Sequence, residues 1–207
     1  MLGCILLASV TMKAQQLCNL WQEMPDSIIP LLNKSMRIEL SEYMRGDLNA
    51  DNGVGEFKGL LNSLNDSTFI YDCSHDFLWL RLTAYSQLEM KILPRERDSV
   101  ICVVHTYLAP AAESTIAFYD FHWNKLQNLL PEIKEDDLIC KPDSMEEDMF
   151  IDAKALLEPK MIRLSLSKSE YSVAASYSIP LMSDDDKRLL NTILLQKKFK
   201  WNGAMFN

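Results

Sequence analysis

Residues 77–108 read FLWLRLTAYSQLEMKILPRERDSVICVVHTYL, and this stretch decides the fold of the chain. Two segments of this stretch alternate apolar residues with others. The apolar positions are Leu78, Leu80 and Leu82 in the first segment and Leu88, Met90 and Ile92 in the second. A period of two is the spacing of a strand that buries one face. The opposite face of the second strand carries Gln87, Glu89 and Lys91, so we expect that face to be wet.

The end of the same stretch has a different pattern. Val100–Leu108 is apolar at odd and even positions alike, which predicts an interior strand that is covered on both faces. A break at Ala109–Ala112 precedes another strand at Ser114–Phe121. Because the connections between these runs are short and polar, we expect consecutive strands to pair as an antiparallel meander.

Helical spacing dominates the chain before this sheet. Leu17–Met44 has a helical pattern that Pro30 interrupts. The second helix is predicted from about Ser35, with Gly46 as its C-terminal cap. Its predicted apolar face consists of Met36, Leu40, Tyr43 and Met44.

The chain after the sheet predicts a helix, a hairpin, a helix and a short strand. The expected elements are a helix at Ser144–Leu157, strands at 162–166 and 171–179 joined at Lys168-Ser169, a helix capped by Ser183, and a strand at Phe199–Trp201. Residues 172, 174, 176 and 178 form a small, polar face of the hairpin. The order predicts an α+β fold, an antiparallel β-meander packed with N-terminal and C-terminal helices. We expect residues 17–207 to form a single domain, with two coarse helix-plus-sheet halves meeting near 124–159.

The first sixteen residues, MLGCILLASVTMKAQQ, are typical of an export signal. Leu2–Val10 is apolar but too short to span a bilayer, and Ala14 offers signal peptidase a small residue. We therefore expect a mature chain that begins at Gln15 or Gln16, carries no transmembrane segment, and works in the periplasm, at the cell surface or outside the cell. The missing positive n-region is expected if translation starts upstream. A lipid anchor on Cys4 and an uncleaved N-terminal helix are the alternatives.

Composition excludes some partners. A net charge of −8 argues against nucleic acid, whose phosphates need clustered Lys and Arg. The acidic runs Glu132–Asp137, Asp143–Asp152 and Asp184–Asp186 are expected to be solvated surface, with weak binding of a cation or a basic partner as the alternative. Export leaves four cysteines, Cys18, Cys73, Cys102 and Cys140, which allow three pairings; buried free thiols are the favoured state.

Asp47–Gly53, with the sequence DLNADNG, begins like an EF-hand calcium loop. The sixth position is Asn52 instead of Gly, and the twelfth is Lys58, where a bidentate Glu belongs. Asn, Asp and Gly also build surface turns without metal. We predict a turn that does not bind calcium tightly.

Cysteine and histidine approach one another twice in the sequence. Cys73 with His75, and Cys102 with His105, suggest a metal site or a catalytic dyad, but the chain has no C-x2-C knuckle. Cys102 and His105 are three apart on a strand and should point to opposite faces. We expect structural roles for these residues.

The aromatic run Tyr119–Trp123 suggests a carbohydrate-binding patch or, more simply, packing at the end of a strand. Serine hydrolase elbows, P-loops and dinucleotide fingerprints are absent from the sequence. We therefore assign no catalytic, cofactor-binding or metal-ligating residue and no cofactor.

Several segments carry a family resemblance. They are Met24–Leu32 (MPDSIIPLL), Met36–Leu40 (MRIEL), Leu88–Pro94 (LEMKILP), Asp98–Val104 (DSVICVV), Pro110–Ser114 (PAAES) and Phe199–Trp201 (FKW). Together they resemble a family of small exported proteins from Bacteroides-type gut bacteria, catalogued as a domain of unknown function. The resemblance implies export and a single α+β domain, and it brings no catalytic residue.

The sequence therefore favours a non-enzymatic binding or interaction module of the cell envelope. Its sheet surface would bind another envelope protein or a glycan. The alternative is a secreted or periplasmic hydrolase without a recognisable motif. A hydrolase should have a deep pocket with convergent polar groups and shifted pKa values, whereas a binding module should have a shallow exposed aromatic or apolar patch.

Overall fold

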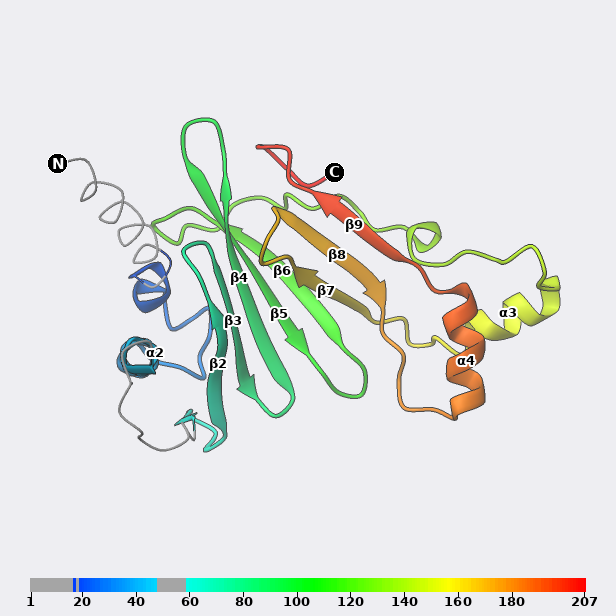
Figure 1. Cartoon of the computed structure of the whole chain (residues 1–207), viewed down its shortest axis with the longest axis horizontal. Coiled ribbons are helices and arrows are strands. Elements are labelled where there is room, and N and C mark those ends of the chain that lie inside the picture. Colours follow the sequence, from blue (N-terminus) through cyan, green and yellow to red (C-terminus); the bar gives the residue numbers. More distant parts are fainter. Residues whose placement is uncertain (1–16, 18, 48–58) are drawn as a thin grey trace.

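The computed structural model describes residues 17, 19–47 and 59–207. Within this part of the chain, six antiparallel strands pair in sequence order (Figure 1). They are β1 (Leu60–Leu61), β2 (Ser67–Cys73), β3 (Phe77–Thr83), β4 (Ser86–Pro94), β5 (Ser99–Tyr107) and β6 (Glu113–Tyr119). Strands that follow one another in the chain are neighbours in the sheet, so the predicted meander is confirmed.

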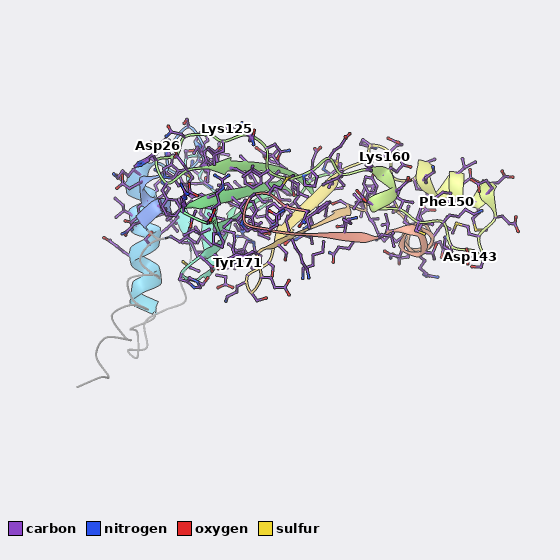
Figure 2. The ribbon with its side chains drawn as sticks, turned by 90° about the horizontal axis from the view of Figure 1, so that it is seen from above. Asp26, Lys125, Asp143, Phe150, Lys160 and Tyr171 are labelled. Atoms are coloured by element: carbon purple, nitrogen blue, oxygen red, sulfur yellow. The ribbon has the colours of Figure 1, made fainter. Side chains whose placement is uncertain are left out.

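A second antiparallel sheet follows in the C-terminal part. Its strands are β7 (Ile162–Leu166), β8 (Ser172–Tyr177) and β9 (Gln196–Lys200). The accompanying helices are the short 3-10 helix η1 (Glu135–Asp137), α3 (Glu147–Ala155) and α4 (Asp184–Ile193). Figure 1 places α3 and α4 at the end of the molecule away from the N-terminal helices, and Figure 2 shows the same from above, with Asp26 at one end and Phe150 of α3 at the other. The α+β class is therefore confirmed.

The first sheet separates two hydrophobic cores. β5 lies between β4 and β6, and Val100–Val104 is buried throughout. Ile101 and Val103 pack with the N-terminal helical segments, whereas Cys102 and Val104 pack with the second sheet and with α3 and α4. The apolar pattern on both faces of this strand therefore identified the interior strand correctly.

A helix, a series of turns and a second helix cover the N-terminal core. Residues 19–23 are helical, residues 24–33 form turns, and α2 covers Lys34–Asp47. The predicted interruption at Pro30 is confirmed. The predicted cap is wrong, because Gly46 lies within α2. Met36 and Leu40 contact the core as expected, and the side chains of Tyr43 and Met44 lie outside the described part.

Arg37 holds these turns together. Its side chain is 1% exposed, and its guanidinium donates hydrogen bonds to the backbone carbonyls of Met24 and Leu32. One nitrogen also lies 2.8 Å from Asp26 Oδ1. A guanidinium suits this position because its fork can serve several acceptors at once. The MPDSIIPLL and MRIEL segments are thus physically linked through this residue.

The C-terminal elements follow the predicted order. Within the predicted range 144–157 the helix α3 is shorter, and the hairpin β7–β8 has the expected alternation. Ser183 caps α4, since its Oγ accepts the backbone N–H of Asp186 at 3.2 Å. No helix in the described ranges is long and apolar enough to cross a membrane.

Side chains of the first sheet close the outer edge of β7. The N–H of Leu164 donates to Ser114 Oγ at 2.9 Å, the N–H of Leu166 donates to Glu89 Oε2 at 2.5 Å, and the Lys91 ammonium donates to the carbonyl of Lys168 at 2.7 Å. We call these three contacts the docking seam. They satisfy backbone groups that an edge strand leaves without a ladder partner.

The docking seam corrects one prediction from the sequence. The face of β4 that carries Gln87, Glu89 and Lys91 does not face water, because these side chains are 7%, 5% and 2% exposed. Lys91 is paired with Asp76 at 3.0 Å, so its buried charge is compensated. The polar alternation along β4 therefore marks a polar interface between two sheets.

Candidate functional site

One part of the first sheet lies at the margin of the core between the sheets, against which Trp79 packs. It occupies the face of β2, β3 and β4 that the second sheet borders through the docking seam and through the ion pair between Asp72 and Lys168. Six residues define what we call the platform: Phe69, Tyr71, Trp79, Arg81, Gln87 and Glu89. Strand pairing sets Trp79 beside Glu89 and Arg81 beside Gln87. Side chains at paired positions share one face of a sheet, so the six side chains are neighbours; Tyr71 is exposed, whereas Gln87 and Glu89 are buried at the border with the second sheet.

Three aromatic rings run along the platform. The centroids of Tyr71 and Trp79 are 4.8 Å apart, and those of Phe69 and Tyr71 are 6.5 Å apart. Arg81 stacks on the Phe69 ring with its Cζ 4.7 Å from the centroid. Tyr71 is 52% exposed, so the middle ring of the strip presents its surface to solvent.

A register shift in β2 shapes this strip. Ile70 pairs with Leu80 and Asp72 pairs with Trp79, so Tyr71 is an extra residue at a bulge. The bulge lets both Tyr71 and Asp72 lie on the platform side, and Asp72 there meets Lys168 of the β7–β8 turn at 2.7 Å. Such bulges commonly re-aim side chains at sites that bind ligands.

Three hydrogen-bond donors of the platform have no partner among the described residues. They are Trp79 Nε1, Arg81 Nε and Gln87 Nε2, and all three atoms are buried. Buried donors are normally satisfied, because leaving one unpaired costs about 1–3 kcal/mol. Three such donors at neighbouring positions of one sheet face are the strongest sign of a binding site in the described part of the chain.

Glu89 forms the border between the platform and β7. Burial raises the pKa of Glu89, while hydrogen bonds from the Leu166 N–H and the Ser165 hydroxyl and the charge of Arg163 lower it. Arg163 shares a face of β7 with Ser165, whose hydroxyl lies 3.3 Å from Glu89 Oε1, so Arg163 stands next to this border. Arg163 is exposed on β7 and pairs with Ser176 of β8.

Cys102 and His105 lie on opposite faces of β5, as expected from their spacing, and His75 lies beside Asp76. Cys102 is buried in the core between the sheets, and His105 stacks on Tyr107 with ring centroids 4.5 Å apart, on the opposite face. Cys73 contacts the carbonyl of Ser74. His75 Nε2 instead lies 3.7 Å from Asp76. Cys102 and Cys140 are free thiols, and Cys18 lies outside the described residues.

The side chains of the aromatic run Tyr119–Trp123 pack at the end of a strand, which is the simpler of the two interpretations of this run. Trp123 is 9% exposed and packs with Tyr119 against the N-terminal core. Asp120 orders the turn by accepting the backbone N–H groups of His122 and Asn124, and the side-chain hydrogen bond from Asn124 is the main cause of its lowered pKa. This run therefore offers no exposed carbohydrate-binding patch.

The acidic runs lie at the surface. Glu135 contacts Lys160 at 2.7 Å and Asp137 contacts Lys197 at 3.2 Å, while Asp184–Asp186 occupy the first turn of α4. No group of three His, Cys, Asp or Glu side chains in the described part could hold a metal ion. The calcium-like loop from Asp47 to Lys58 lies outside the described residues apart from its first position.

A depression of about 420 Å³ lies between the β4–β5 hairpin and the C-terminal turn. Arg95, Arg97 and Asp98 line it, together with Gln127 and Gly203. None of its charged lining residues is buried. It therefore lacks the desolvated titratable groups expected of an enzyme active site.

Sequence reasoning did not find the platform. Trp79 and Arg81 were visible only as the partners that alternate with Leu78, Leu80 and Leu82. Phe69 and Tyr71 lie on another strand, and the bulge that sets their register leaves no mark in the sequence. The sequence does carry one sign of the platform: the face of β3 opposite the leucines has aromatic and charged side chains, and such a face is too polar for an ordinary core.

Comparison with known proteins supports the fold. A solved structure described as a domain of an uncharacterized protein from Porphyromonas gingivalis W83 is similar, with a TM-score of 0.69 and 23% sequence identity over 93% of this chain and 96% of that one. No curated protein matches the chain. The family model described as a protein of unknown function, DUF3256, matches residues 9–206. The chain therefore belongs to the DUF3256 family, consistent with its resemblance to a domain of unknown function.

Proposed function

We propose that this protein is an exported, non-enzymatic binding module of the cell envelope whose platform binds a glycan. The observation that carries the proposal is the aromatic strip, exposed at Tyr71, beside three unpartnered donors. Ligand sites combine apolar or aromatic surface with a few placed polar groups, and the platform has both. The export signal at residues 1–16 supports the envelope location.

A sugar suits these groups chemically. The C–H face of a pyranose ring packs against an aromatic ring, and its hydroxyl and ring oxygens accept hydrogen bonds. Tyr71 and Trp79 supply the stacking surface, while Trp79 Nε1 and Gln87 Nε2 supply donors. Because both donors are buried, we expect neighbouring side chains to move when the ligand binds.

A hydrolase is the second candidate, and Glu89 is the observation that favours it. Its pKa is raised by burial, as that of a general acid would be. Its carboxylate, however, accepts the Leu166 N–H at 2.5 Å and contacts the Ser165 hydroxyl at 3.3 Å, so it is held by the docking seam. This engagement favours a structural role over proton transfer.

A glycan array, followed by calorimetric titration of any glycan that binds, tests the proposal on the mature chain. We expect Tyr71→Ala and Trp79→Ala to weaken binding at least about tenfold, since each removes stacking area. Tyr107→Ala is the matched control, because Tyr107 is also 52% exposed but lies on the opposite face of the same sheet. Binding to no glycan, or equal loss in the control, overturns the proposal. Release of shorter sugars that Glu89→Gln abolishes would establish the hydrolase instead.

A further inference from the structure

Arg81 of the platform and Arg163 beside it make no direct ion pair with any described residue. In the described part of the chain, no ion pair within 4.0 Å joins Arg81 or Arg163 to Asp or Glu. Arg81 is half-buried and stacks on Phe69, whereas Arg163 is exposed.

The neighbouring carboxylates are already engaged. Asp72 meets Lys168 at 2.7 Å, and Glu89 accepts from Leu166 and Ser165. The charge of Arg81 acts on Asp66 and that of Arg163 acts on Glu89, but neither guanidinium is held in a direct ion pair by a described residue, so both can contact an acidic ligand. Strand pairing sets Arg81 beside Gln87, and Gln87 is 7% exposed with its Nε2 unpartnered.

Every unsatisfied polar atom at this corner is a donor. Trp79 Nε1, Arg81 Nε and Gln87 Nε2 can only be satisfied by acceptors, and arginine prefers acceptors arranged as in a carboxylate. A neutral sugar offers oxygens that both donate and accept, whereas a carboxylate only accepts. The donor set therefore matches an anion better than a neutral hydroxyl cluster.

We infer that the platform recognises an acidic sugar, with its ring against Tyr71 and Trp79 and its carboxylate at Arg81 and Arg163. This inference rests on the proposed function, since it names the class of ligand that the same surface binds. Charge-assisted hydrogen bonds are the stronger kind, so the carboxylate would dominate the choice among sugars.

The test compares free acids with their methyl esters. The probes are galacturonate oligosaccharides, glucuronate oligosaccharides and sialyl-lactose, each beside the same compound esterified at its carboxylate. We expect at least one free acid to bind about tenfold or more tightly than its ester, because esterification removes a charged acceptor. Raising the salt concentration should reduce that difference.

Arginine variants assign the effect to these residues. Arg163→Gln is the main variant, because Arg163 is exposed and its removal should leave the fold intact; Arg81→Gln is the second. Both should lose affinity for the free acid and keep affinity for the ester. Arg188→Gln in α4 is the control, since the Arg188 side chain is 77% exposed and lies on another element.

The outcomes separate this inference from the proposed function. Equal binding of acids and esters, lost in Tyr71→Ala, keeps the glycan-binding function and overturns the acidic-sugar inference. Preference for the acid that survives in both arginine variants also overturns it, because the carboxylate then binds elsewhere. Binding of no sugar in either form overturns the proposed function and this inference with it.

Discussion

Glu89 of β4 accepts the backbone N–H of Leu166 in β7 at 2.5 Å, so a side chain of the first sheet completes the hydrogen bonding of a strand in the second. The contact joins residues 77 positions apart. The same carboxylate also borders the platform, so the packing of the two sheets and the platform share a residue.

Removing the Glu89 carboxylate should weaken the junction between the sheets. Glu89→Ala leaves the Leu166 N–H buried without an acceptor, and we expect a loss of about 2–3 kcal/mol in the free energy of unfolding. Glu89→Gln keeps an acceptor and should cost less than about 1 kcal/mol. Urea melts measure both. Glu96→Ala, in the exposed β4–β5 turn, is the control; a Glu89→Ala protein as stable as this control would mean that the docking seam contributes little.

The pH dependence of stability should carry the signature of Glu89. Burial raises its pKa above the usual 4.5, so the folded state binds this proton more tightly than the unfolded state. The stability contribution of Glu89 is therefore complete below pH 4.5 and is lost as the pH rises through its folded pKa. Relative to Glu89→Gln, which does not titrate, the parent protein should gain unfolding free energy as the pH falls from about 7 towards 4.5.

Other carboxyls do not disturb that comparison. Asp66 and Asp120 have lowered pKa values. The main cause is the backbone N–H of Ala84 for Asp66 and the Asn124 side chain for Asp120. Their contributions to the stability of the fold are therefore lost only as the pH falls below about the usual pKa of 3.8. Both groups are present in parent and variant alike. A difference that stays constant with pH would contradict the burial of the Glu89 charge.

The Arg37 contacts predict a strong effect at a position outside the platform. Arg37→Met keeps much of the apolar stem but leaves the carbonyls of Met24 and Leu32 without their donor. We expect a loss of about 3 kcal/mol in unfolding free energy. Asp26→Asn should cost less than about 1 kcal/mol, because the Asp26 side chain is 59% exposed. Equal losses in the two variants would assign the stability to the ion pair instead of the carbonyls.

The sequence predicted correctly those features that are determined by residues close together in the chain. β5 was placed correctly because residues 100–104 are apolar on both faces, and only an interior strand buries both. Ser183 was recognised as a cap because an N-cap hydroxyl acts locally. Such features depend on neighbouring residues in the chain or on the spacing of apolar side chains along a strand.

The failures involve partners that are distant in sequence. Gln87, Glu89 and Lys91 alternate as a solvent-exposed face would, but Glu89 and Lys91 contact a hairpin more than seventy positions away. Period alone cannot separate water from a polar protein surface. The platform was missed for the same reason, because it combines β2, β3 and β4 through a bulge that the sequence pattern does not reveal.

Thiol reactivity should distinguish the three described cysteines. Complete burial raises the pKa of the Cys102 thiol well above its usual range, with the charge of Glu89 adding to the effect. The reactive species is the thiolate, so Cys102 should resist iodoacetamide in the folded protein and react only when urea unfolds it. Cys140 is exposed and should be modified first. Mass spectrometry of the digested protein reports each site, and fast alkylation of Cys102 under native conditions would contradict its burial between the sheets.

The final prediction compares one charge at two depths. Val104 is fully buried between the sheets, so Val104→Asp should bury an unpaired carboxylate and cost several kcal/mol of unfolding free energy. Ser176 is half-buried and pairs across strands with the exposed Arg163, so Ser176→Asp gives the new carboxylate a nearby cation and should change stability by no more than about 0.5 kcal/mol. Urea melts of both variants measure the contrast. A stable Val104→Asp would contradict the interior position of β5. An unfolded Ser176→Asp would mean that another layer covers the outer face of the hairpin, and that result would leave the Arg163 side of the platform closed to a ligand.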